Sequence, residues 1–265
     1  MSGIGFIGTG NMGYAILKGL MSKHPEQQVV VTDVDKLKVK TVADEFGILT
    51  AESNKSCVQQ SKYILLAVKP QYYDGILAEI REDITPDHVI ITIAPGITIS
   101  TIQQKTGGAA RVVRAMPNTP ALLGEGMTGV SYEADLFSED EVTTIHMLFK
   151  AFGKMKVVEE RLMNAVVCVS GSSPAYMYLF IEALADSAVR YGLPRDTAYE
   201  MAAQTMLGSA KMILETGEHP GKLKDQVCSP GGTTIAAVAA LEEHGFRNAI
   251  MKATDACYHR AEELK

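Results

Sequence analysis

The sequence has no tryptophan and only 4 cysteines among its 265 residues. The cysteines lie far apart without C-x-x-C spacing, so they indicate free thiols in a reducing compartment rather than a disulfide framework. An excess of basic residues is missing too, because the formal net charge is −6. This balance gives no electrostatic reason to expect a nucleic acid or an anionic membrane as a partner. Because the cysteines indicate free thiols, we expect a cytoplasmic protein.

Long hydrophobic runs and metal-ligand spacings are also absent. No uninterrupted apolar run is long enough to cross a bilayer. A predicted strand begins almost at the first residue, so we expect no signal peptide. The six histidines show neither metal-ligand spacing nor a partner for a catalytic triad, so we expect surface positions for them and no metal site. These histidines are His24, His88, His146, His219, His244 and His259.

A glycine-rich stretch near the amino terminus is the most informative feature that is present. Ile4–Ile7 has the pattern of a short buried strand, and a helical pattern starts soon after it. Between them, Gly8, Gly10 and Gly13 stand in G-x-G-x-x-G spacing. In this context the three glycines allow a tight turn, a close approach of the backbone to a pyrophosphate, and close helix–strand packing. The stretch predicts a dinucleotide on a helix amino terminus; the alternative is an ordinary glycine-rich turn.

Asp33 ends the next predicted strand, residues 28–32, and lies twenty residues after Gly13. A carboxylate at this position can accept hydrogen bonds from both hydroxyls of an adenosine ribose. A 2′-phosphate would meet a like charge there, and the following turn offers no arginine to neutralise it. We therefore predict that NADH is used at least as well as NADPH, unless Lys36 or Lys38 reaches the phosphate.

Several later segments have the pattern of strands in the same sheet. Residues 63–68 are a continuous apolar run typical of a buried parallel strand, and residues 88–93 and 111–116 have the pattern of further strands. Residues 127–132 and 155–158 are candidate edge strands, and between them Ser138 has the pattern of an N-cap at a helix start. Predicted helices separate these strands, so the sequence predicts an α/β fold, with a parallel, doubly wound Rossmann-type sheet over residues 1–158.

The remaining residues, 159–265, contain no convincing strand. Helical patterns cover residues 162–191, with an interruption around Pro174, and then residues 195–216, 234–243 and 246–264. The first of these segments is apolar on nearly every face, and such a helix has to be buried on all sides. We expect a second subunit to bury it; the alternative is a domain that folds back on the sheet.

A second glycine-rich stretch, residues 225–234, precedes the helical pattern that starts at Thr234. Gly231 and Gly232 are followed by Thr233 and Thr234, and amide groups at such a helix start suit a small carboxylate. A threonine hydroxyl beside them can hydrogen-bond a substrate nitrogen. The spacing fits a glycine-rich turn with a capping threonine equally well. Lys69 is a candidate catalytic lysine at a strand end, but a cofactor-facing or solvated role explains it as well.

Taken together, these motifs resemble the pyrroline-5-carboxylate reductase family over the whole length of the chain. The resemblance rests on residues 4–12, 67–70, 114–120 and 170–176, and most specifically on residues 225–234 with 241–247. It implies a Rossmann domain followed by a helical dimerisation domain, in dimers that can assemble into decamers. It also implies the reduction of 1-pyrroline-5-carboxylate to L-proline by NADPH or NADH.

The resemblance also implies roles for single residues. The implied cofactor-binding residues are Ile7, Gly8, Thr9, Gly10, Asn11, Met12, Asn54, Ala67, Val68, Lys69, Pro70 and Gln226. The implied substrate-binding residues are Ser229, Gly231, Gly232, Thr233 and Thr234, with Thr234 at the reacting nitrogen. One departure is Ser173, which stands where the family usually has glycine.

Three other functions remain as alternatives at this point. A β-hydroxyacid dehydrogenase would carry a catalytic lysine four residues after Gly171, where this chain has Ala175. An imine reductase differs mainly in the Ser229–Thr234 motif. A nucleotide-sensing protein could keep the Rossmann fold without turnover.

Overall fold

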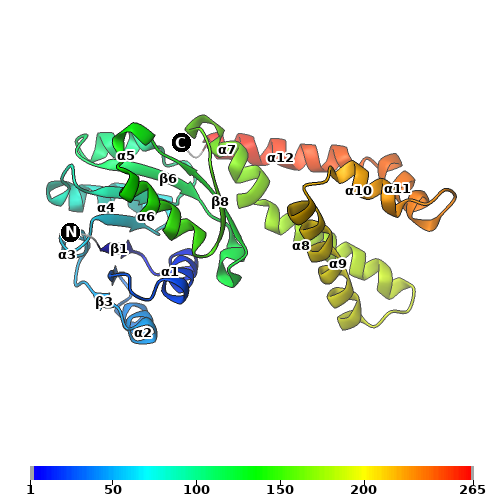
Figure 1. Ribbon diagram of the computed structural model, residues 1–265, viewed down its shortest axis with the longest axis horizontal. Helices are drawn as coiled ribbons and strands as arrows, with labels where there is room; N and C mark the ends of the chain where they lie inside the picture. The colour runs from blue at the N-terminus through cyan, green and yellow to red at the C-terminus, as the bar shows by residue number, and fades with distance from the viewer. Residues whose placement is uncertain (1–2, 264–265) are drawn as a thin grey trace. The chain divides into compact units, whose positions relative to one another are not determined.

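The computed structural model describes residues 3–263 and divides into two compact units (Figure 1). The first unit contains the chain up to Ser172 together with the segment from Cys257 onward, and the second contains Ser173–Ala256. The first unit holds all the strands of the sheet, and the second is helical. The boundary after Ser172 lies later in the chain than the predicted change to helices at residue 159, and the first unit also includes the segment from Cys257 onward.

The first unit is built on an 8-stranded sheet in the order β3-β2-β1-β4-β5-β6-β7-β8. The chain moves outward from β1 in one direction and then, from β4 onward, in the other, which is the doubly wound arrangement. The strands are β1 (Ile4–Ile7), β2 (Val29–Thr32), β3 (Leu49–Thr50), β4 (Tyr63–Leu66), β5 (Val89–Thr92), β6 (Arg111–Met116), β7 (Gly126–Ser131) and β8 (Gly153–Val157).

One strand pair departs from the parallel sheet that the sequence predicts. β7 runs antiparallel to β6, with Arg114 opposite Ser131, and β8 is again parallel to β7. Nine residues, 117–125, connect β6 to β7 and contain only the short 3-10 turn Thr119–Leu123. A parallel crossover needs a dozen residues or more, so this connection can only reverse the chain. The short edge strand β3 was not predicted either, because its two residues are too few to show a pattern.

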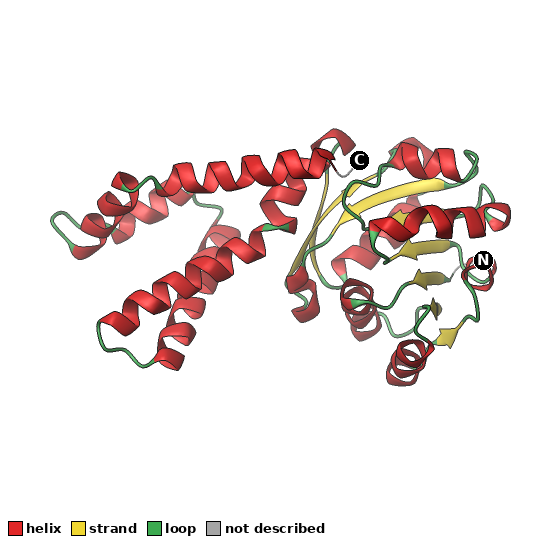
Figure 2. Cartoon of the chain, turned by 180° about the vertical axis from the view of Figure 1, so that it is seen from behind, coloured by secondary structure: helices red, strands yellow, loops and turns green. Residues whose placement is uncertain are grey.

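Helices cover both faces of the sheet, as Figure 2 shows from behind. On one face, alternate strand residues such as Phe6 and Leu65 pack against α1 (Asn11–Lys23), α2 (Lys36–Phe46) and α6 (Glu139–Lys150). On the other face, residues such as Ile64 and Leu66 pack against α3 (Asn54–Gln59), α4 (Tyr73–Ile80) and α5 (Ile99–Lys105). Burial on both faces explains why the strands read as continuous apolar runs.

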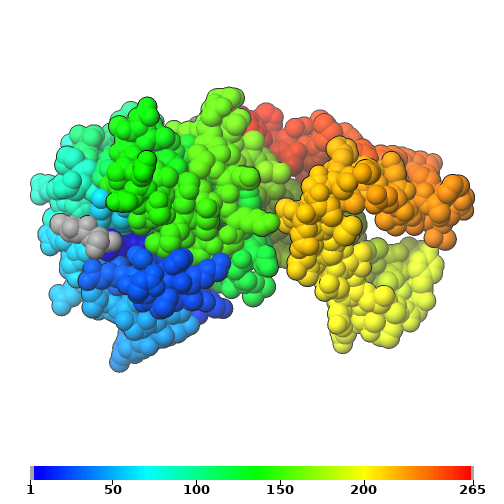
Figure 3. Space-filling view, in the orientation of Figure 1, coloured from blue at the N-terminus to red at the C-terminus, as the bar shows by residue number. Residues whose placement is uncertain are grey.

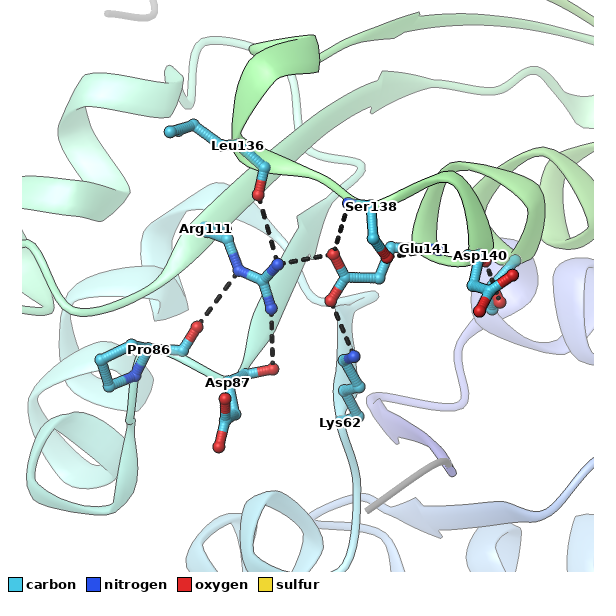
Figure 4. Close-up of polar contacts among 9 residues, drawn as sticks. Lys62, Pro86, Asp87, Arg111, Leu136, Ser138, Asp140 and Glu141 are labelled. Atoms are coloured by element: carbon cyan, nitrogen blue, oxygen red, sulfur yellow. Dashed lines mark hydrogen bonds and ion pairs between the residues drawn. The ribbon is translucent and has the colours of Figure 1, made fainter.

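A buried carboxylate joins the amino end of α6 to the sheet (Figure 4). Glu141 accepts hydrogen bonds from Arg111 (Nη1–Oε2, 2.6 Å) and Lys62 (Nζ–Oε1, 2.7 Å). It also completes the capping box of the helix with Ser138. Burial raises the pKa of Glu141, but the bonds from Arg111, Lys62 and Ser138 outweigh it and hold the pKa at about 2. The predicted helix start after Ser138 is confirmed.

One of the six histidines contradicts the expectation of a surface position. His88 is only 2% exposed. Its Nδ1 lies 3.0 Å from the Thr85 amide, which donates to it, and its Nε2 lies 3.3 Å from the Val58 carbonyl oxygen. The ring therefore supports the loop before β5, because buried polar groups need such partners.

The helices after the sheet follow the predicted segments, with one addition. The predicted interruption of residues 162–191 is confirmed: α7 (Met163–Val166) and a π-helical turn at Val167–Gly171 precede α8 (Ser173–Arg190), and Pro174 stands in the first turn of this new helix. The addition is α10 (Pro220–Val227), which was not predicted. The others are α9 (Arg195–Thr216), α11 (Thr233–Glu243) and α12 (Phe246–Glu263). Leu264, the predicted last residue of α12, lies outside the described residues.

Large apolar side chains remain exposed on the second unit, whose surface is drawn from yellow-green to orange in Figure 3. α8 packs against α9, and the rings of Phe180 and Phe246 lie 6.1 Å apart. Nevertheless Ala185 is the one residue of α8 that counts as buried. Within residues 3–263, no helix combines the length and apolar character needed to span a membrane.

Candidate dinucleotide and substrate sites

The three glycines after β1 meet different steric demands. Gly8 has a φ of +104°, and a Cβ on it would lie 2.6 Å from the carbonyl oxygen of Ala67. A Cβ on Gly13 would lie 2.5 Å from the carbonyl oxygen of Gly8. Gly10, in contrast, is exposed, and nothing lies within 4 Å of the position of its Cβ. Gly8 and Gly13 are therefore required by the fold, whereas the bare backbone at Gly10 leaves room for a ligand.

The start of α1 fits an anion. Gly10 is the N-cap, and no side chain caps the helix. The first turn has no acidic residue either. The amides of Asn11 and Met12 belong to the first turn, where a helix provides no internal acceptors. These groups, at the positive end of α1, fit the pyrophosphate of a dinucleotide.

Asp33 lies next to this loop, at the carboxyl end of β2. Its Oδ2 accepts from the Thr9 amide (2.7 Å) and from the Thr9 hydroxyl (3.1 Å), and its Oδ1 accepts from the Asp35 amide (3.0 Å). Burial raises the pKa of Asp33, but the bonds from Asp35 and Thr9 outweigh it and lower the pKa below its usual value. Asp33 is therefore an ionised carboxylate, held in place beside the predicted ribose site.

The two lysines that follow have other contacts. Lys36 donates from Nζ to the carbonyl oxygen of Glu52 (2.9 Å), and Lys38 lies 3.6 Å from Oδ2 of Asp35. Asp35 also caps α2 by accepting from the amides of Leu37 and Lys38. This cap was not predicted, although an aspartate directly before a helical pattern is a known start signal.

The turn after β4 lies beside the loop after β1. The amide of Ala67 donates to the carbonyl oxygen of Ile7 (2.9 Å), and a Cγ atom of Val68 lies 2.9 Å from where a Cβ on Gly8 would stand. Lys69 is exposed and precedes a 3-10 turn that starts at Pro70. The strand order reverses between β1 and β4, which is where doubly wound sheets bind nucleotides. The predicted residues 7–12, 33 and 67–70 thus gather at one edge.

Asn54 opens α3, directly after the Ser53 N-cap. Its Nδ2 donates to Oε2 of Glu79 (2.7 Å). The side-chain nitrogen of Asn54 is therefore engaged within the protein, and its Oδ1 is the atom that could accept a hydrogen bond from a ligand.

Two polar contacts near β6 were not predicted. Asn118 is buried, its Nδ2 donates to the carbonyl oxygen of Ser170 (3.0 Å), and its Oδ1 accepts from the amide of Met127 (2.9 Å). Arg114 pairs with Glu160 (Nη1–Oε1, 3.1 Å). These residues hold the segment after β8 against the sheet. Their partners are distant in sequence, so only the resemblance to the family drew attention to the 114–120 stretch.

The predicted substrate residues form a tight turn in the second unit. The amide of Gly232 donates to the carbonyl oxygen of Ser229 (3.0 Å). Gly231 has a φ of +69°, and a Cβ on Gly232 would lie 2.3 Å from Oγ of Ser229. The positive φ of Gly231 therefore requires glycine in this turn, whereas Gly232 has an ordinary φ of −80° and its close neighbour is a hydroxyl that can rotate.

The structure decides against the capping-threonine alternative at this turn. Gly232 is the N-cap of α11, and no side chain caps the helix. Thr233 and Thr234 occupy the first two helical positions, with Thr233 exposed and Thr234 half-buried. Uncapped amides next to two threonine hydroxyls suit a carboxylate-bearing ligand.

Gln226 is exposed on α10, which leads into this turn. His219 caps that helix: its Nδ1 accepts from the amide of Gly221 (3.0 Å). Neither the helix nor its cap was predicted, because histidine is a rare N-cap residue and the helix has only 8 residues. Within the described residues, no three His, Cys, Asp or Glu side chains gather so that they could hold a metal ion.

Two family models match the chain, one in each half. Residues 160–264 match the model described as pyrroline-5-carboxylate reductase dimerisation. Residues 3–96 match the model described as NADP oxidoreductase, coenzyme F420-dependent. The first match covers the helices, and the second covers the glycine-rich loop and the strands on both sides of it.

Curated relatives match along the full length. The pyrroline-5-carboxylate reductase of Escherichia coli (strain K12) is 48% identical over 98% of this chain and 97% of its own. That of Methanosarcina acetivorans is 40% identical, with the same coverage of both chains.

Solved structures agree with these matches. The pyrroline-5-carboxylate reductase of Coxiella burnetii has a TM-score of 0.92 and 34% identity, over 100% of this chain and 98% of its own. The pyrroline carboxylate reductase of Plasmodium falciparum, with NADP bound, has a TM-score of 0.86 and 27% identity, over 99% of this chain and 98% of its own. This chain therefore belongs to the pyrroline-5-carboxylate reductase family.

Proposed function

We propose that the loops after β1, β2 and β4 bind NAD(P)H and that the Ser229–Thr234 turn binds 1-pyrroline-5-carboxylate, which the chain reduces to L-proline. The observation that carries the proposal is the open Gly10 at an uncapped helix start. It supports pyrophosphate binding by backbone amides, because a side chain at this position would fill the space that the ligand needs. The NADP in the Plasmodium falciparum relative supports the same class of cofactor.

The substrate supplies much of the reactivity itself. It is a cyclic imine with a carboxylate, and when protonated it accepts hydride readily, so no metal is required. NAD(P)H supplies the hydride. We assign the carboxylate to the amides of the turn at Gly231 and Gly232, and the ring nitrogen to the hydroxyl of Thr234. Holding the imine carbon in place would then be the main contribution of the protein.

The alternatives lack comparable support. An imine reductase from Myxococcus stipitatus has a TM-score of 0.57 at 16% identity, which shows a shared fold alone. The helical position for a dehydrogenase lysine holds Ala175, in the first part of α8. A sensor without turnover would not require the threonines at the start of α11.

The proposal extends to domains, assembly and location. We assign residues 1–158 to cofactor binding and residues 159–265 to dimerisation and substrate binding. The match to a dimerisation model shows a homo-oligomer, and a decamer built from dimers is the finer proposal. A reducing cytoplasm would keep the four cysteines as the free thiols seen in the structure.

A turnover assay tests the function and the cofactor preference together. Wild-type protein should oxidise both nucleotides when 1-pyrroline-5-carboxylate is added, and kcat/KM for NADH should equal or exceed that for NADPH. The reason is that Asp33 is ionised and both lysines have other contacts. Asp33→Ser should shift the preference toward NADPH.

Two results would contradict these expectations. Absence of turnover with either nucleotide would leave a nucleotide-binding protein without this activity. A wild-type preference for NADPH of more than about tenfold, which is ~1.4 kcal/mol, would show that the lysines set the specificity despite their contacts.

A further inference from the structure

Thr9 and Asp33 make a contact that nucleotide binding, as proposed above, does not explain. Thr9 is the residue between the first two glycines of the loop, and it is only 6% exposed. Both of its hydrogen-bond donors, the amide and the hydroxyl, point to the same carboxylate oxygen, Oδ2 of Asp33. A residue in a phosphate-binding loop would be expected to offer its amide to the ligand instead.

The contact lies directly beyond the ladder between β1 and β2. β1 and β2 pair in parallel from Ile4 to Ile7, and the amide of Gly8 then donates to the carbonyl oxygen of Thr32 (2.9 Å). The next residue, Thr9, donates its amide to the side chain of Asp33 rather than to a backbone carbonyl. The loop is thereby tied to β2 one residue beyond the end of the strands.

The second carboxylate oxygen fixes the acceptor in turn. Oδ1 of Asp33 accepts from the amide of Asp35, and Asp35 is the N-cap of α2. The position of Asp33 is therefore set by the start of α2, and the position of Thr9 is set by Asp33. Hydrogen bonds to an ionised carboxylate are stronger than hydrogen bonds between neutral groups.

The contact decides which amides remain for an anion. The Thr9 amide is used within the protein, so the pyrophosphate is left to the amides from Gly10 onward, at the start of α1. A fixed loop binds more tightly than one that has to be ordered by the ligand.

We propose that Asp33 is a positioning residue: through Thr9 it holds the glycine-rich loop in the conformation that binds the nucleotide pyrophosphate. This inference rests on the proposed function. This role differs from hydrogen bonding of the Asp33 carboxylate to the ribose hydroxyls, since the pyrophosphate is common to NADH and NADPH. Loss of the contact should therefore weaken both nucleotides equally.

Thr9→Val tests this proposal. Valine lacks the hydroxyl but keeps the branched shape of threonine, and the charge of Asp33 is unchanged. Dissociation constants for NADH and NADPH, measured by fluorescence titration, should both rise about five- to tenfold. The KM for each nucleotide should rise by the same factor as its dissociation constant. Thr9→Ser, which keeps the hydroxyl, should remain close to wild type. In an Asp33→Asn background, Thr9→Val should add little.

Thr41→Val is the matched control. Thr41 is an exposed residue of α2 whose hydroxyl donates to the carbonyl oxygen of Leu37 in its own helix (3.0 Å). It should bind both nucleotides like wild type. A thermal melt of each variant separates weaker binding from loss of folding.

Three results would count against the proposal. Unchanged affinities for both nucleotides in Thr9→Val and in Asp33→Asn, which also weakens the bond from the Thr9 amide, would show that the contact does not position the loop. A loss for NADH alone would assign Asp33 to the ribose. Wild-type protein that bound neither nucleotide would overturn the proposed function itself, and this inference with it.

Discussion

At the scale of single residues, two glycines of the same motif, Gly8 and Gly10, meet different requirements. Gly8 has a positive φ and no space for a side chain, so the fold requires it. Gly10 has ordinary backbone angles and open space around it, so the fold does not require it. A residue that the fold can spare but the proposed ligand cannot is a good probe of function.

Gly10→Ala should therefore fold normally and bind nucleotide poorly. The added methyl group contacts nothing in the protein, but it stands where the pyrophosphate would approach. We expect a KM for NAD(P)H at least about tenfold higher, with an unchanged melting temperature. Gly8→Ala should instead lower the stability or abolish folding. Gly75→Ala, at an open helical position, is the control for methyl addition. Normal nucleotide affinity in Gly10→Ala would move the pyrophosphate elsewhere.

Thr234→Ala should lower kcat/KM by about tenfold to a hundredfold, the loss of one hydrogen bond of ~1.5–3 kcal/mol to a charged group. The affinity for the cofactor should barely change. Thr234 stands in the first turn of α11 and does not cap it, so the helix should survive the change. Thr254→Ala removes a half-buried hydroxyl that bonds only within α12, and it should leave the kinetics unaltered. Equal kcat/KM in Thr234→Ala and wild type would exclude contact with the substrate nitrogen.

At the scale of elements, one carboxylate connects a helix to strands. Glu141, at the start of α6, is bound by Arg111 of β6 and by Lys62, next to β4. Arg111 also donates to the carbonyl oxygens of Pro86, Asp87 and Leu136. Because these groups satisfy one another while they are largely buried, removal of the charge of Glu141 would leave two cations without their shared partner.

Glu141→Gln should lower the free energy of unfolding at pH 7 by about 1.5–3 kcal/mol. The pKa of Glu141 is about 2 in the folded protein against 4.5 for the free group, so its contribution is complete above pH 4.5 and is lost between pH 4.5 and 2. Urea unfolding at several pH values should show the gap between wild type and variant closing through this window. Glu139→Gln, an exposed position in the same first turn, should change little. A constant gap down to pH 2 would assign the effect to packing.

At the scale of the whole molecule, the second unit exposes several large apolar side chains, which is unusual for a protein that works as a monomer in water. On α8, Leu179 is 66% exposed, Leu184 44% and Met177 43%. Phe180 and Ile181 belong to the same helix. Exposed apolar faces of this kind indicate contact with another protein chain, and the match to a dimerisation model supports a second copy of this one.

Analytical ultracentrifugation should show no stable monomer at micromolar concentration. Leu179→Asp should increase the monomer fraction, because a charge would be buried at the contact. Leu123→Asp is the control: Leu123 is 84% exposed but lies in the first unit, after β6. A folded, active wild-type monomer would contradict the interface.

The sequence alone determined the features that depend on neighbouring residues. The glycines after β1, the strands of the sheet core, the start of α6 and the change to helices all follow from local sterics, periodicity and capping. These were confirmed, because each is fixed within a few residues of chain. The family resemblance supplied the activity for the same reason, since its motifs are contiguous.

Only the tertiary structure decided the features that join residues far apart. These are the reversal at β7, the partners of Glu141, the buried position of His88 and the bonds between Asp33 and Thr9. Each depends on which segments the fold brings together, and 24 residues separate Thr9 from Asp33. No local pattern encodes such a contact, because a carboxylate at a strand end can accept hydrogen bonds from a ligand or from its own chain equally well.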